Sequence, residues 1–561
     1  MRRRGLGHMS FERVSLMRTT WIPAVLLALA PTLAAAQGSS APLALTVDDA
    51  VRMALQNNVD LAADRLDPQI SDARLAAAAG LFKPVFASSV QRNNQLQPPS
   101  GLLFPTATRT DVSTTNMGLN QRLPWMGTSY SFGWDTSHTE SNSFLNSFNP
   151  LLRSGMAISV SQPLLKDFHT DAARTNLELN QTNRSIADTR LQESVVHTTA
   201  AVKAAYWNLV AARANVAARQ AALRLAEELV RVNRAKVDVG QSPPIDLVSA
   251  QAEVASNTEQ LIVAETNVKQ SEDRLRLLIF DAARRDIWSV QIEPTDAPPV
   301  GTAAIDIEAA VTNALRARAD LARAHKELEN TNASLRLSGN QKLPDVRVNA
   351  SYQANALGGT EVLRTGGFPG TIVGPGREVD FGNLLDQLFR TSYPNWAVGV
   401  SVSYPLGRSA EDANQVRSLL EAKQAGQRVR SAEARVIQQV RDAAWKVEMN
   451  ARRLETVRAG RDLAEQRQDV EQKRFDAGIS TSFLVIQAQR DLSQARQNEL
   501  AAVLAYDLSL VDFEALQQAG PAGQPTGLTT QQATATAAAT VVPGAARSAT
   551  ASAVSGTAGV F

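Results

Sequence analysis

The chain has 561 residues, of which 44% are hydrophobic and 20% charged, a composition typical of a folded protein rather than a disordered one. It contains no cysteine, which excludes disulfides, thiolate metal sites, cysteine nucleophiles and lipidation at an N-terminal cysteine. The formal net charge of +2 comes from residues 1–36, which hold five arginines and one glutamate, so the basic balance gives no indication of nucleic-acid binding.

Residues 1–36 have the pattern of an export signal peptide. A basic front precedes a short apolar stretch near Trp21–Ala30, and small residues precede the cleavage point that we expect after Ala36. The alternative, a membrane anchor, is disfavoured by Pro31 and by the shortness of the apolar stretch. No later apolar run reaches about 18 residues, so an exported chain that enters a membrane would have to do so as a β-barrel.

The rest of the chain contains an internal repeat. LTVDDAVRMALQNNVDLAADR, from Leu45, aligns without gaps with IDIEAAVTNALRARADLARAH, from Ile305, at an offset of 260. Further along, SVSQPLL (159–165) resembles SVSYPLG (401–407), and Gly240 aligns with Gly478. Each half therefore predicts a helix, a strand region, a long helix, a tight turn and a second long helix.

The repeat divides the chain into five predicted parts. Residues 1–36 are the signal peptide, 45–280 the first repeat, 281–304 a linker in which we expect one short strand, 305–519 the second repeat, and 520–561 a disordered tail rich in Ala, Thr and Gly. The strand region of the first repeat is longer than that of the second by about 20 residues.

Four segments alternate between apolar and polar residues and predict amphipathic β-strands: residues 128–135, 155–162, 345–353 and 398–404. The polar stretches 93–116, 136–150 and 355–394 between them predict loops. Such strands occur half-buried in soluble sheets, and they also suit a membrane barrel with one face in lipid. A few strands per chain cannot close a barrel with a lumen, so a membrane barrel would have to be shared by several chains.

The helices predicted after the strands are very long. Residues Asp171 to Val239 contain no Gly and no Pro, and 69 helical residues would extend about 100 Å. A long antiparallel coiled coil is one interpretation. The many alanines favour a second one, a cylinder in which each helix packs against neighbours on two sides.

The two long hairpins turn at KVDVGQSPPIDLVSAQ (236–251) and RFDAGISTSFLVIQAQ (474–489). Gly240 and Gly478 can adopt the left-handed conformation that ends a helix. We expect Ser242 to cap the return helix of the first hairpin with Pro243 as its first residue, and Thr481 or Ser482 to cap the other.

No pattern in the sequence indicates catalysis or a cofactor. The five histidines lack metal-ligand spacing, and the Gly-rich stretch 358–378 lacks the lysine of a phosphate loop. Trp207 and Trp445 are expected to pack between helices. We therefore predict a protein that is not an enzyme and binds no cofactor or metal.

The duplicated helix starts, the SVSQPLL and SVSYPLG junctions and the DVG and DAG helix tips resemble the outer membrane efflux protein (TolC) family over residues 45–518. The resemblance implies a mainly α fold with a β-barrel part, in which long helical hairpins form a trimeric periplasmic α-barrel. Each subunit would add four strands to a shared twelve-stranded outer-membrane β-barrel. The strand-like segments around Asn116–Asp135 depart from this simple count, and they either extend the barrel strands or form an extracellular hairpin.

The function implied by the resemblance is a passive exit duct of a tripartite efflux or type I secretion system. The implied location is the outer membrane of a Gram-negative bacterium, with a large periplasmic part. The implied partners are two further subunits in a homotrimer, outer-membrane lipid, a periplasmic adaptor (membrane fusion) protein and an inner-membrane transporter. The alternative is a periplasmic coiled-coil scaffold with soluble β modules, and an exported enzyme is a more distant one.

The resemblance also implies sites at the helix tips. The positions that match the adaptor-docking turns are Val239, Gly240, Gln241, Ala477, Gly478 and Ile479. The family's periplasmic gate often has acidic residues six and nine positions after the second tip glycine, where this chain has Leu484 and Gln487. The same six-residue step in the first half gives Asp246, which would form an acidic ring in a trimer. The alternative is an ordinary acidic residue in the first turn of a helix, where the helix dipole favours a negative charge.

Overall fold

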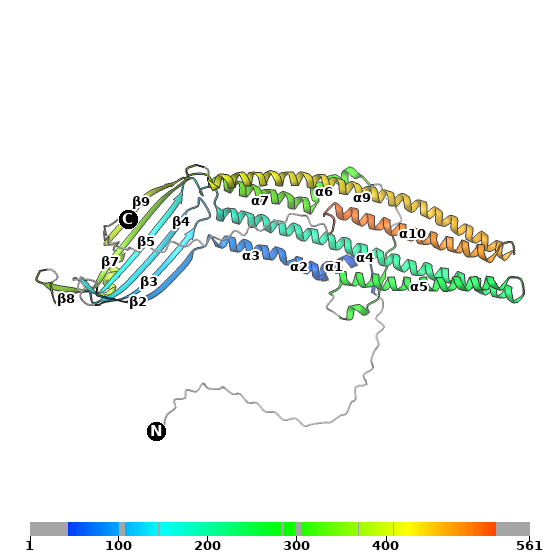
Figure 1. Ribbon diagram of the computed structural model, residues 1–561, viewed down its shortest axis with the longest axis horizontal. Coiled ribbons are helices and arrows are strands. Elements are labelled where there is room, and N and C mark those ends of the chain that lie inside the picture. The colour runs from blue at the N-terminus through cyan, green and yellow to red at the C-terminus, as the bar shows by residue number, and fades with distance from the viewer. Residues whose placement is uncertain are drawn as a thin grey trace, which may run out of the picture.

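The computed structural model describes residues 43–99, 107–143, 146–281, 285–298, 305–367, 370–407 and 409–522. The predicted signal peptide and nearly all of the predicted tail lie outside these residues. The described part is long and narrow, with a β-sheet at one end and the turns of two helical hairpins at the other (Figure 1). Within the described part, no helix is long and apolar enough to cross a membrane.

The predicted duplication is confirmed by the helices. The first half contains α1 (Val47–Asn57), α2 (Val59–Asp64), α3 (Leu66–Gly80), α4 (Ala172–Asp238) and α5 (Pro244–Ile279). The second half contains α6 (Ile307–Ala317), α7 (Ala319–Gln341), α9 (Ala410–Asp476) and α10 (Ser482–Leu516). The helices α4 and α9 have 67 residues each, which corresponds to about 100 Å.

The starts of the two longest helices are fixed by side-chain caps. Asp171 accepts a hydrogen bond from the backbone N–H of Arg174 at 2.8 Å, and Ser409 and Asp412 form a capping box at the start of α9. At the return helix of the first hairpin, the predicted start was wrong by one residue. The helix α5 begins at Pro244, because the ring of Pro244 holds Pro243 in an extended conformation (ψ 146°) and makes it the cap.

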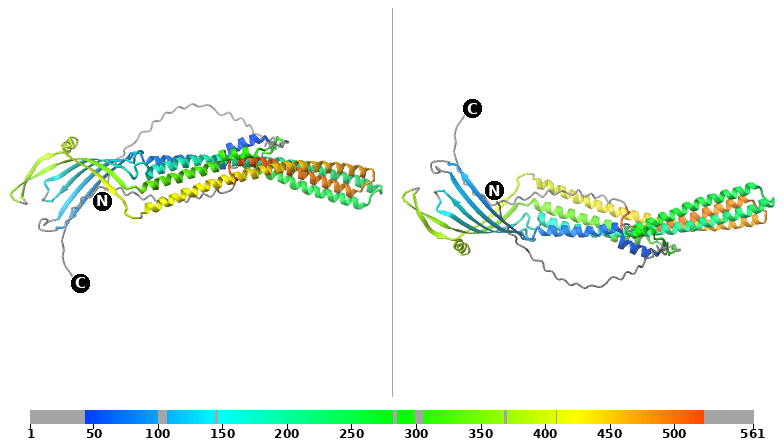
Figure 2. Two further views of the ribbon diagram at one scale, coloured as in Figure 1. Left: turned by 90° about the horizontal axis from the view of Figure 1, so that it is seen from above. Right: turned by 90° about the horizontal axis from the view of Figure 1, so that it is seen from below.

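The long helices form one layer. Next to the sheet the order is α3, α4, α7, α9, and beyond the middle of the molecule it is α5, α4, α10, α9 (Figures 1 and 2). The helices α4 and α9 run through both sections, whereas their neighbours change halfway. One edge of the layer is thus formed by α3 and α5, and the opposite edge by α9.

The sheet is antiparallel and has six long strands in the order β2 (Val85–Gln97), β3 (Thr108–Arg122), β4 (Ser129–Ser141), β5 (Phe148–Pro163), β7 (Asp345–Thr365) and β9 (Tyr393–Ser403). A further strand, β8 (Thr371–Val379), pairs only with the outer part of β7, and α8 (Phe381–Phe389) follows it. Two short strands, β1 (Leu43–Leu45) and β6 (Ile292–Pro294), form a separate parallel pair. A short 3-10 turn at Arg285–Ser289 precedes β6 in the chain.

Two sequence expectations about the sheet were wrong. The resemblance implied four strands per chain, but β3 and β4 add a complete hairpin and raise the number of long strands to six. The stretches 93–116, 136–150 and 355–394, expected as loops, contribute large parts of β2, β3, β4 and β7 and the first three residues of β5, together with β8 and α8. The outer segments of β2, β3 and β4 are mostly polar on both faces, so they lack the alternation that identifies a strand in a sequence.

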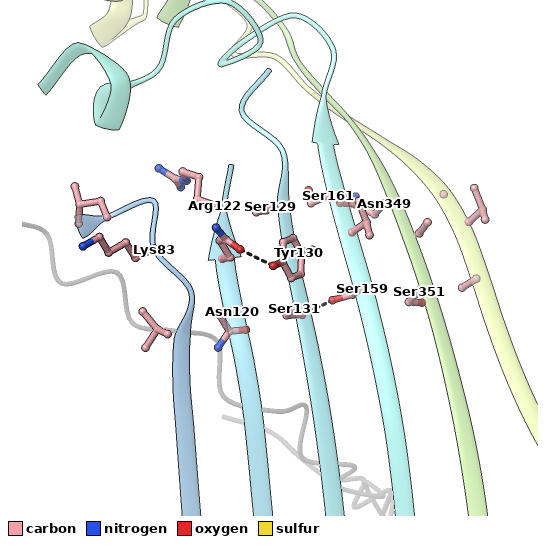
Figure 3. Close-up of a pocket in the computed structure, with 18 residues that line it drawn as sticks. Lys83, Asn120, Arg122, Ser129, Tyr130, Ser131, Ser159, Ser161, Asn349 and Ser351 are labelled. Carbon is pink, nitrogen blue, oxygen red and sulfur yellow. Dashed lines mark hydrogen bonds between the residues drawn. The ribbon is translucent and has the colours of Figure 1, made fainter. Parts of the chain in front are cut away.

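The two faces of the sheet differ in polarity. Register places Phe132, Ile158, Tyr352 and Trp396 side by side on one face, which we call the apolar face. The opposite, polar face carries hydroxyl and amide side chains on neighbouring strands (Figure 3). Those labelled in the figure include Asn120, Ser131, Ser159, Asn349 and Ser351.

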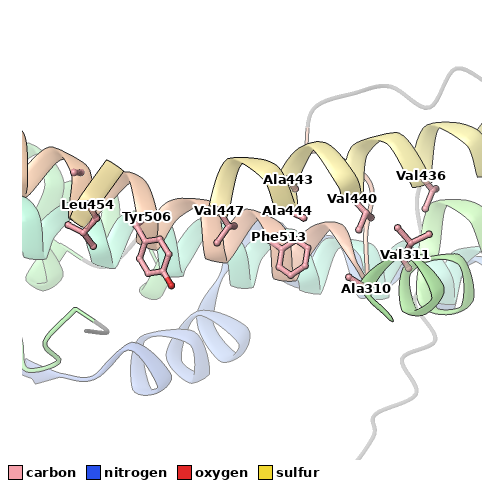
Figure 4. Packing of buried hydrophobic residues seen from close by; sticks show 12 residues of the cluster. Ala310, Val311, Val436, Val440, Ala443, Ala444, Val447, Leu454, Tyr506 and Phe513 are labelled. Carbon is pink, nitrogen blue, oxygen red and sulfur yellow. The ribbon is translucent and has the colours of Figure 1, made fainter. Parts of the chain in front are cut away.

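Each half has its own hydrophobic core where a short helix lies along a long hairpin. Ala50 and Ala54 of α1 are buried against α4 and α5, and Ala310 and Ala314, their repeat equivalents, are buried against α9 and α10 (Figure 4). The small side chains allow the backbones to approach closely. The internal repeat is therefore visible in the two cores as well as in the helices.

A joint lies beside each core, where the short helices change direction. Asn58 caps α2 and donates a hydrogen bond to the Leu278 carbonyl at the end of α5. Its repeat equivalent, Arg318, is almost fully buried and pairs with Asp320 at 2.8 Å. The next residue, Ala319, donates its backbone N–H to the carbonyl of Gln518. Each joint thus fastens a short helix to the end of a return helix.

Candidate functional site

The tips of the two hairpins have the same backbone geometry. Gly240 has φ +71° and Gly478 has φ +73°, the left-handed region in which an L side chain is strained. The N–H of Gln241 donates to the Lys236 carbonyl at 2.8 Å, and that of Ile479 donates to the Arg474 carbonyl at 2.9 Å. These bonds satisfy carbonyls that would otherwise have no partner at the ends of α4 and α9.

Both tips expose large apolar side chains. Val239 is 68% exposed, Ile479 75% and Phe483 70%, and Ile245 is exposed as well. Among the predicted docking residues, Gly240, Gln241, Ala477 and Gly478 are also exposed. Clustered apolar exposure of this kind is characteristic of a surface that another protein covers.

Three contacts join the first hairpin to the second close to the tips. The Asn233 side chain donates to the Ser482 hydroxyl at 2.7 Å. Lys236 lies 3.5 Å from the centre of the Phe475 ring and donates to the Phe475 carbonyl. Slightly further in, Arg490 of α10 forms an ion pair with the buried Glu253 of α5 at 2.7 Å. We call these contacts the inter-hairpin contacts.

The candidate gate residues lie next to these inter-hairpin contacts. Asp246 is half-buried in the first turn of α5, and its carbonyl accepts a hydrogen bond from Asn233 at 3.4 Å. Leu484 is exposed in the first turn of α10. Gln487 is half-buried and donates to Asp491, which in turn pairs with Arg467 at 3.1 Å.

Sequence reasoning missed the ion pair that the fold forms here. Glu253 and Arg490 are 237 residues apart, and nothing in the residues around them indicates which hairpin positions meet. One signal was present, since the repeat aligns Glu253 with Asp491, so both return helices carry an acid at the same distance from the tip. The guanidinium of Arg490 is held charged by this carboxylate, which raises its pKa.

The electrostatics of the tips are otherwise those of ordinary surface pairs. The Ser480 hydroxyl donates to Glu471 at 2.8 Å, and this hydrogen bond lowers the pKa of that carboxyl. Among the described residues, no group of three or more His, Asp or Glu side chains could hold a metal ion. Trp207 packs edge to face against Tyr206, as expected of a core residue, whereas Trp445 is half-exposed beneath Arg441.

The apolar face of the sheet forms a band of limited height. On β9 and just beyond it, Trp396, Val398, Val400, Val402 and Tyr404 follow at every second position, and all are exposed. The eight residue steps from Trp396 to Tyr404 extend about 27 Å, and with the usual tilt they cover about 20 Å of height. Aromatic rings at both ends of such a band are typical of strands that cross a lipid bilayer.

The sequence model of the outer membrane efflux protein family matches residues 117–279 and 310–519, which is most of the chain. The chain belongs to this family. One matched segment lies in each half of the repeat, so the family match includes the internal duplication. A comparison with curated protein sequences found no match.

Solved structures with the same fold include membrane proteins from three bacteria. A membrane protein of Pseudomonas aeruginosa has a TM-score of 0.62 at 14% identity, covering 85% of this chain and 91% of that one. The Campylobacter jejuni CmeC outer membrane channel has a TM-score of 0.60 at 15% identity, covering 84% and 85%. The outer membrane protein VceC of Vibrio cholerae has a TM-score of 0.59 at 14% identity, covering 84% and 96%.

At these identities the similarity concerns the fold. Together with the family match it confirms the predicted fold class, which is mainly α, internally duplicated, with long helical hairpins and a β part of the outer-membrane channel type.

Proposed function

We propose that this chain is one subunit of an outer-membrane exit duct, with the sheet in the membrane and the helices in the periplasm. The observation that carries the proposal is the open layer. The described residues form a single wall whose two long edges are free, and each edge runs from sheet to helices without changing side. A wall of this kind encloses nothing until copies of it join edge to edge.

The free edges are suited to each other. The strands β2 and β9 are the outer strands of the six, and an unpaired strand edge in lipid is very costly. Because the chain contributes an even number of alternating strands, β9 of one copy and β2 of the next would run antiparallel. Copies can therefore close a ring, and the family to which the chain belongs favours a homotrimer.

The edges of the helical layer carry apolar side chains that would be covered in the ring. Ile262 and Val263 of α5 are more than half exposed at one edge, as are Leu463 and Val470 of α9 at the other. Burial of such side chains against a neighbouring copy would stabilise the assembly by roughly 25 cal/mol for each Å² of apolar surface.

The partners follow from the exposed tips. The apolar surface around Val239 and Ile479 supports docking of a periplasmic adaptor, which would connect the duct to an inner-membrane transporter. Transport through the duct would be passive, because energy would enter at the transporter. The predicted export signal at residues 1–36 fits this location.

The proposed duct is closed at the tips and opens when the two hairpins separate there. In this duct, Asp246 of each subunit would face the axis, and the subunits together would form a ring of carboxylates. Asp246→Ala is expected to raise single-channel conductance or to weaken block by multivalent cations, because a ring of negative charge binds such ions. Unchanged conductance and unchanged block in planar bilayers would remove Asp246 from the gate.

Fractionation and reconstitution test the main proposal against the alternative of a soluble periplasmic scaffold. A duct is expected in the outer-membrane fraction, as a heat-resistant oligomer that conducts ions in planar bilayers. A scaffold would stay in the periplasmic extract and leave the bilayer silent, and that result would overturn the proposal.

A further inference from the structure

The hairpin formed by β3 and β4 is an integral part of the sheet. It pairs with β2 on one side and with β5 on the other over nearly its whole length. Its residues continue both faces, with Phe132 beside Ile158 on the apolar face and Ser131 hydrogen-bonded to Ser159 at 2.6 Å on the polar face. A hairpin that projected as an external loop would have no reason to maintain this alternation.

The extra hairpin brings the sheet to the width of the helical layer. Four helices side by side at 8–10 Å cover roughly 32–40 Å. Strands that are about 4.8 Å apart and tilted by about 40° take up roughly 6 Å each, so six cover about 37 Å and four only about 25 Å. With six strands the two sections match, whereas four strands would force the wall to narrow by a third as it enters the membrane.

We propose that this chain builds a membrane barrel of six strands per subunit, eighteen in a trimer, instead of the four per subunit that its family resemblance implied. This inference rests on the proposed function. Because barrel diameter grows almost linearly with strand number, the backbone diameter would be about 36 Å instead of about 24 Å. The barrel would then be as wide as the helical tube below it.

The consequence concerns the cargo. The polar face offers hydroxyl and amide groups such as Ser159, Ser351 and Asn349 to the lumen at its periplasmic end. After side chains are allowed for, a lumen about 20–25 Å across remains, since barrels of 16–18 strands leave an aqueous channel. The barrel therefore admits bulky hydrophilic cargo, such as polypeptide, and restriction by size lies at the helix tips.

Paired cysteine variants test whether β4 is part of the wall. The chain has no cysteine of its own, so each variant carries a single thiol. Ser131→Cys and Phe132→Cys probe the two faces of β4, and Ser159→Cys and Ile158→Cys are the matched pair on β5, which lies in the wall under either strand number. The full-length protein in outer-membrane vesicles is treated with membrane-impermeant maleimides on poly(ethylene glycol) chains of increasing length.

We expect the two strands to behave alike. Ser131→Cys should react within about threefold of the rate of Ser159→Cys, and Phe132→Cys at least about tenfold more slowly, because lumen and lipid faces alternate along a barrel strand. Polymers about 15–20 Å across should still reach Ser131→Cys. Equal rates at Ser131→Cys and Phe132→Cys, with β5 still alternating, would overturn the six-strand wall.

Electron microscopy of the purified oligomer then counts the strands. Six strands per subunit in the ring are expected. A membrane-embedded ring with four per subunit would overturn this inference and leave the proposed function intact. A protein that forms no ring and stays out of the membrane would overturn both.

Discussion

Asp507 is a buried acid that forms no ion pair with any of the residues that the structure describes. It lies in α10, is 3% exposed, and its Oδ1 atom has no hydrogen-bond partner. Burial raises the pKa of this carboxyl from 3.8 to about 6. Because the pKa is higher in the folded state than in the unfolded state, its contribution to stability is fully present below pH 3.8 and is lost as the pH rises through about 6.

Asp507→Asn is therefore expected to stabilise the protein at neutral pH. The uncharged amide avoids the cost of a buried carboxylate, and the rise in its pKa from 3.8 to about 6 limits that cost to roughly 3 kcal/mol. The melting temperature at pH 7.5 should rise by several degrees relative to the unchanged protein, and the difference should shrink at pH 4.5. A variant that melts lower at both pH values would show that the carboxylate has a partner in the assembly.

The ion pair between Glu253 and Arg490 gives a second prediction at the residue scale. Arg490→Gln removes the charge that pairs with a buried carboxylate, so the two hairpins should separate more easily at the tips. We expect the conductance in planar bilayers to rise several-fold.

Arg496→Gln is the matched control, because Arg496 pairs with Glu465 of α9 and so lies within one hairpin. Its conductance should stay at the starting level. Equal effects of the two variants would mean that the Glu253 pair has no special part in closing the tips.

Among the elements, the long helices and the turns between them were predictable from sequence. A run from Asp171 to Val239 without Gly or Pro predicted α4 to within a residue at each end, because its capping Asp and the tip glycine Gly240 are local signals. The start of α5 was missed by one residue, since two successive prolines compete for the same position. The pairing of Glu253 with Arg490 could not be predicted, because the register between hairpins depends on packing over the whole layer.

The strands, in contrast to the helices, were only partly predictable from sequence. The inner half of β7, with Val346, Val348 and Ala350 on one face, alternates and was found from sequence. The outer half of β3, from Thr108 to Thr115, is polar on both faces and gave no signal. A strand that extends beyond the apolar band contacts water on both sides, so neither face demands apolar residues there.

The difference between the faces of β9 can be tested with one substitution at two adjacent positions. Val400→Arg puts a charge into the apolar band and should destabilise the oligomer by about 2–4 kcal/mol. Gly399→Arg puts the same charge on the polar face, opposite the uncharged Asn349 and with open space for a side chain, so it should be tolerated. The temperature at which the oligomer dissociates on a gel measures both. If the two variants dissociate at the same temperature, β9 does not separate lipid from water.

At the scale of the whole molecule, a single chain is an incomplete fold. Its described residues expose apolar side chains along both edges of the helical layer, and the sheet ends in two unpaired strands. The stability of such a chain depends on the concentration of its copies, as it does for obligate oligomers.

Val263→Asp, at the α5 edge, should therefore weaken assembly and leave the fold of the chain unchanged. Val263 is 55% exposed in the single chain, so the substitution removes little packing within it. A carboxylate buried between copies would be costly. Native mass spectrometry should detect dissociated subunits, and circular dichroism should show the same helicity as before. An oligomer as resistant as the original would mean that this edge stays in water.

The joints at Asn58 and Arg318 divide the molecule mechanically. The helices α5 and α10 end there, whereas α4 and α9 continue into the section beside the sheet. A partner that pushed on the tips would therefore bend the two hairpins at these joints, which lie halfway along the molecule. In the proposed duct, the part between the joints and the tips would move outward while the end at the sheet kept its diameter, so opening one end of the tube would not strain the other.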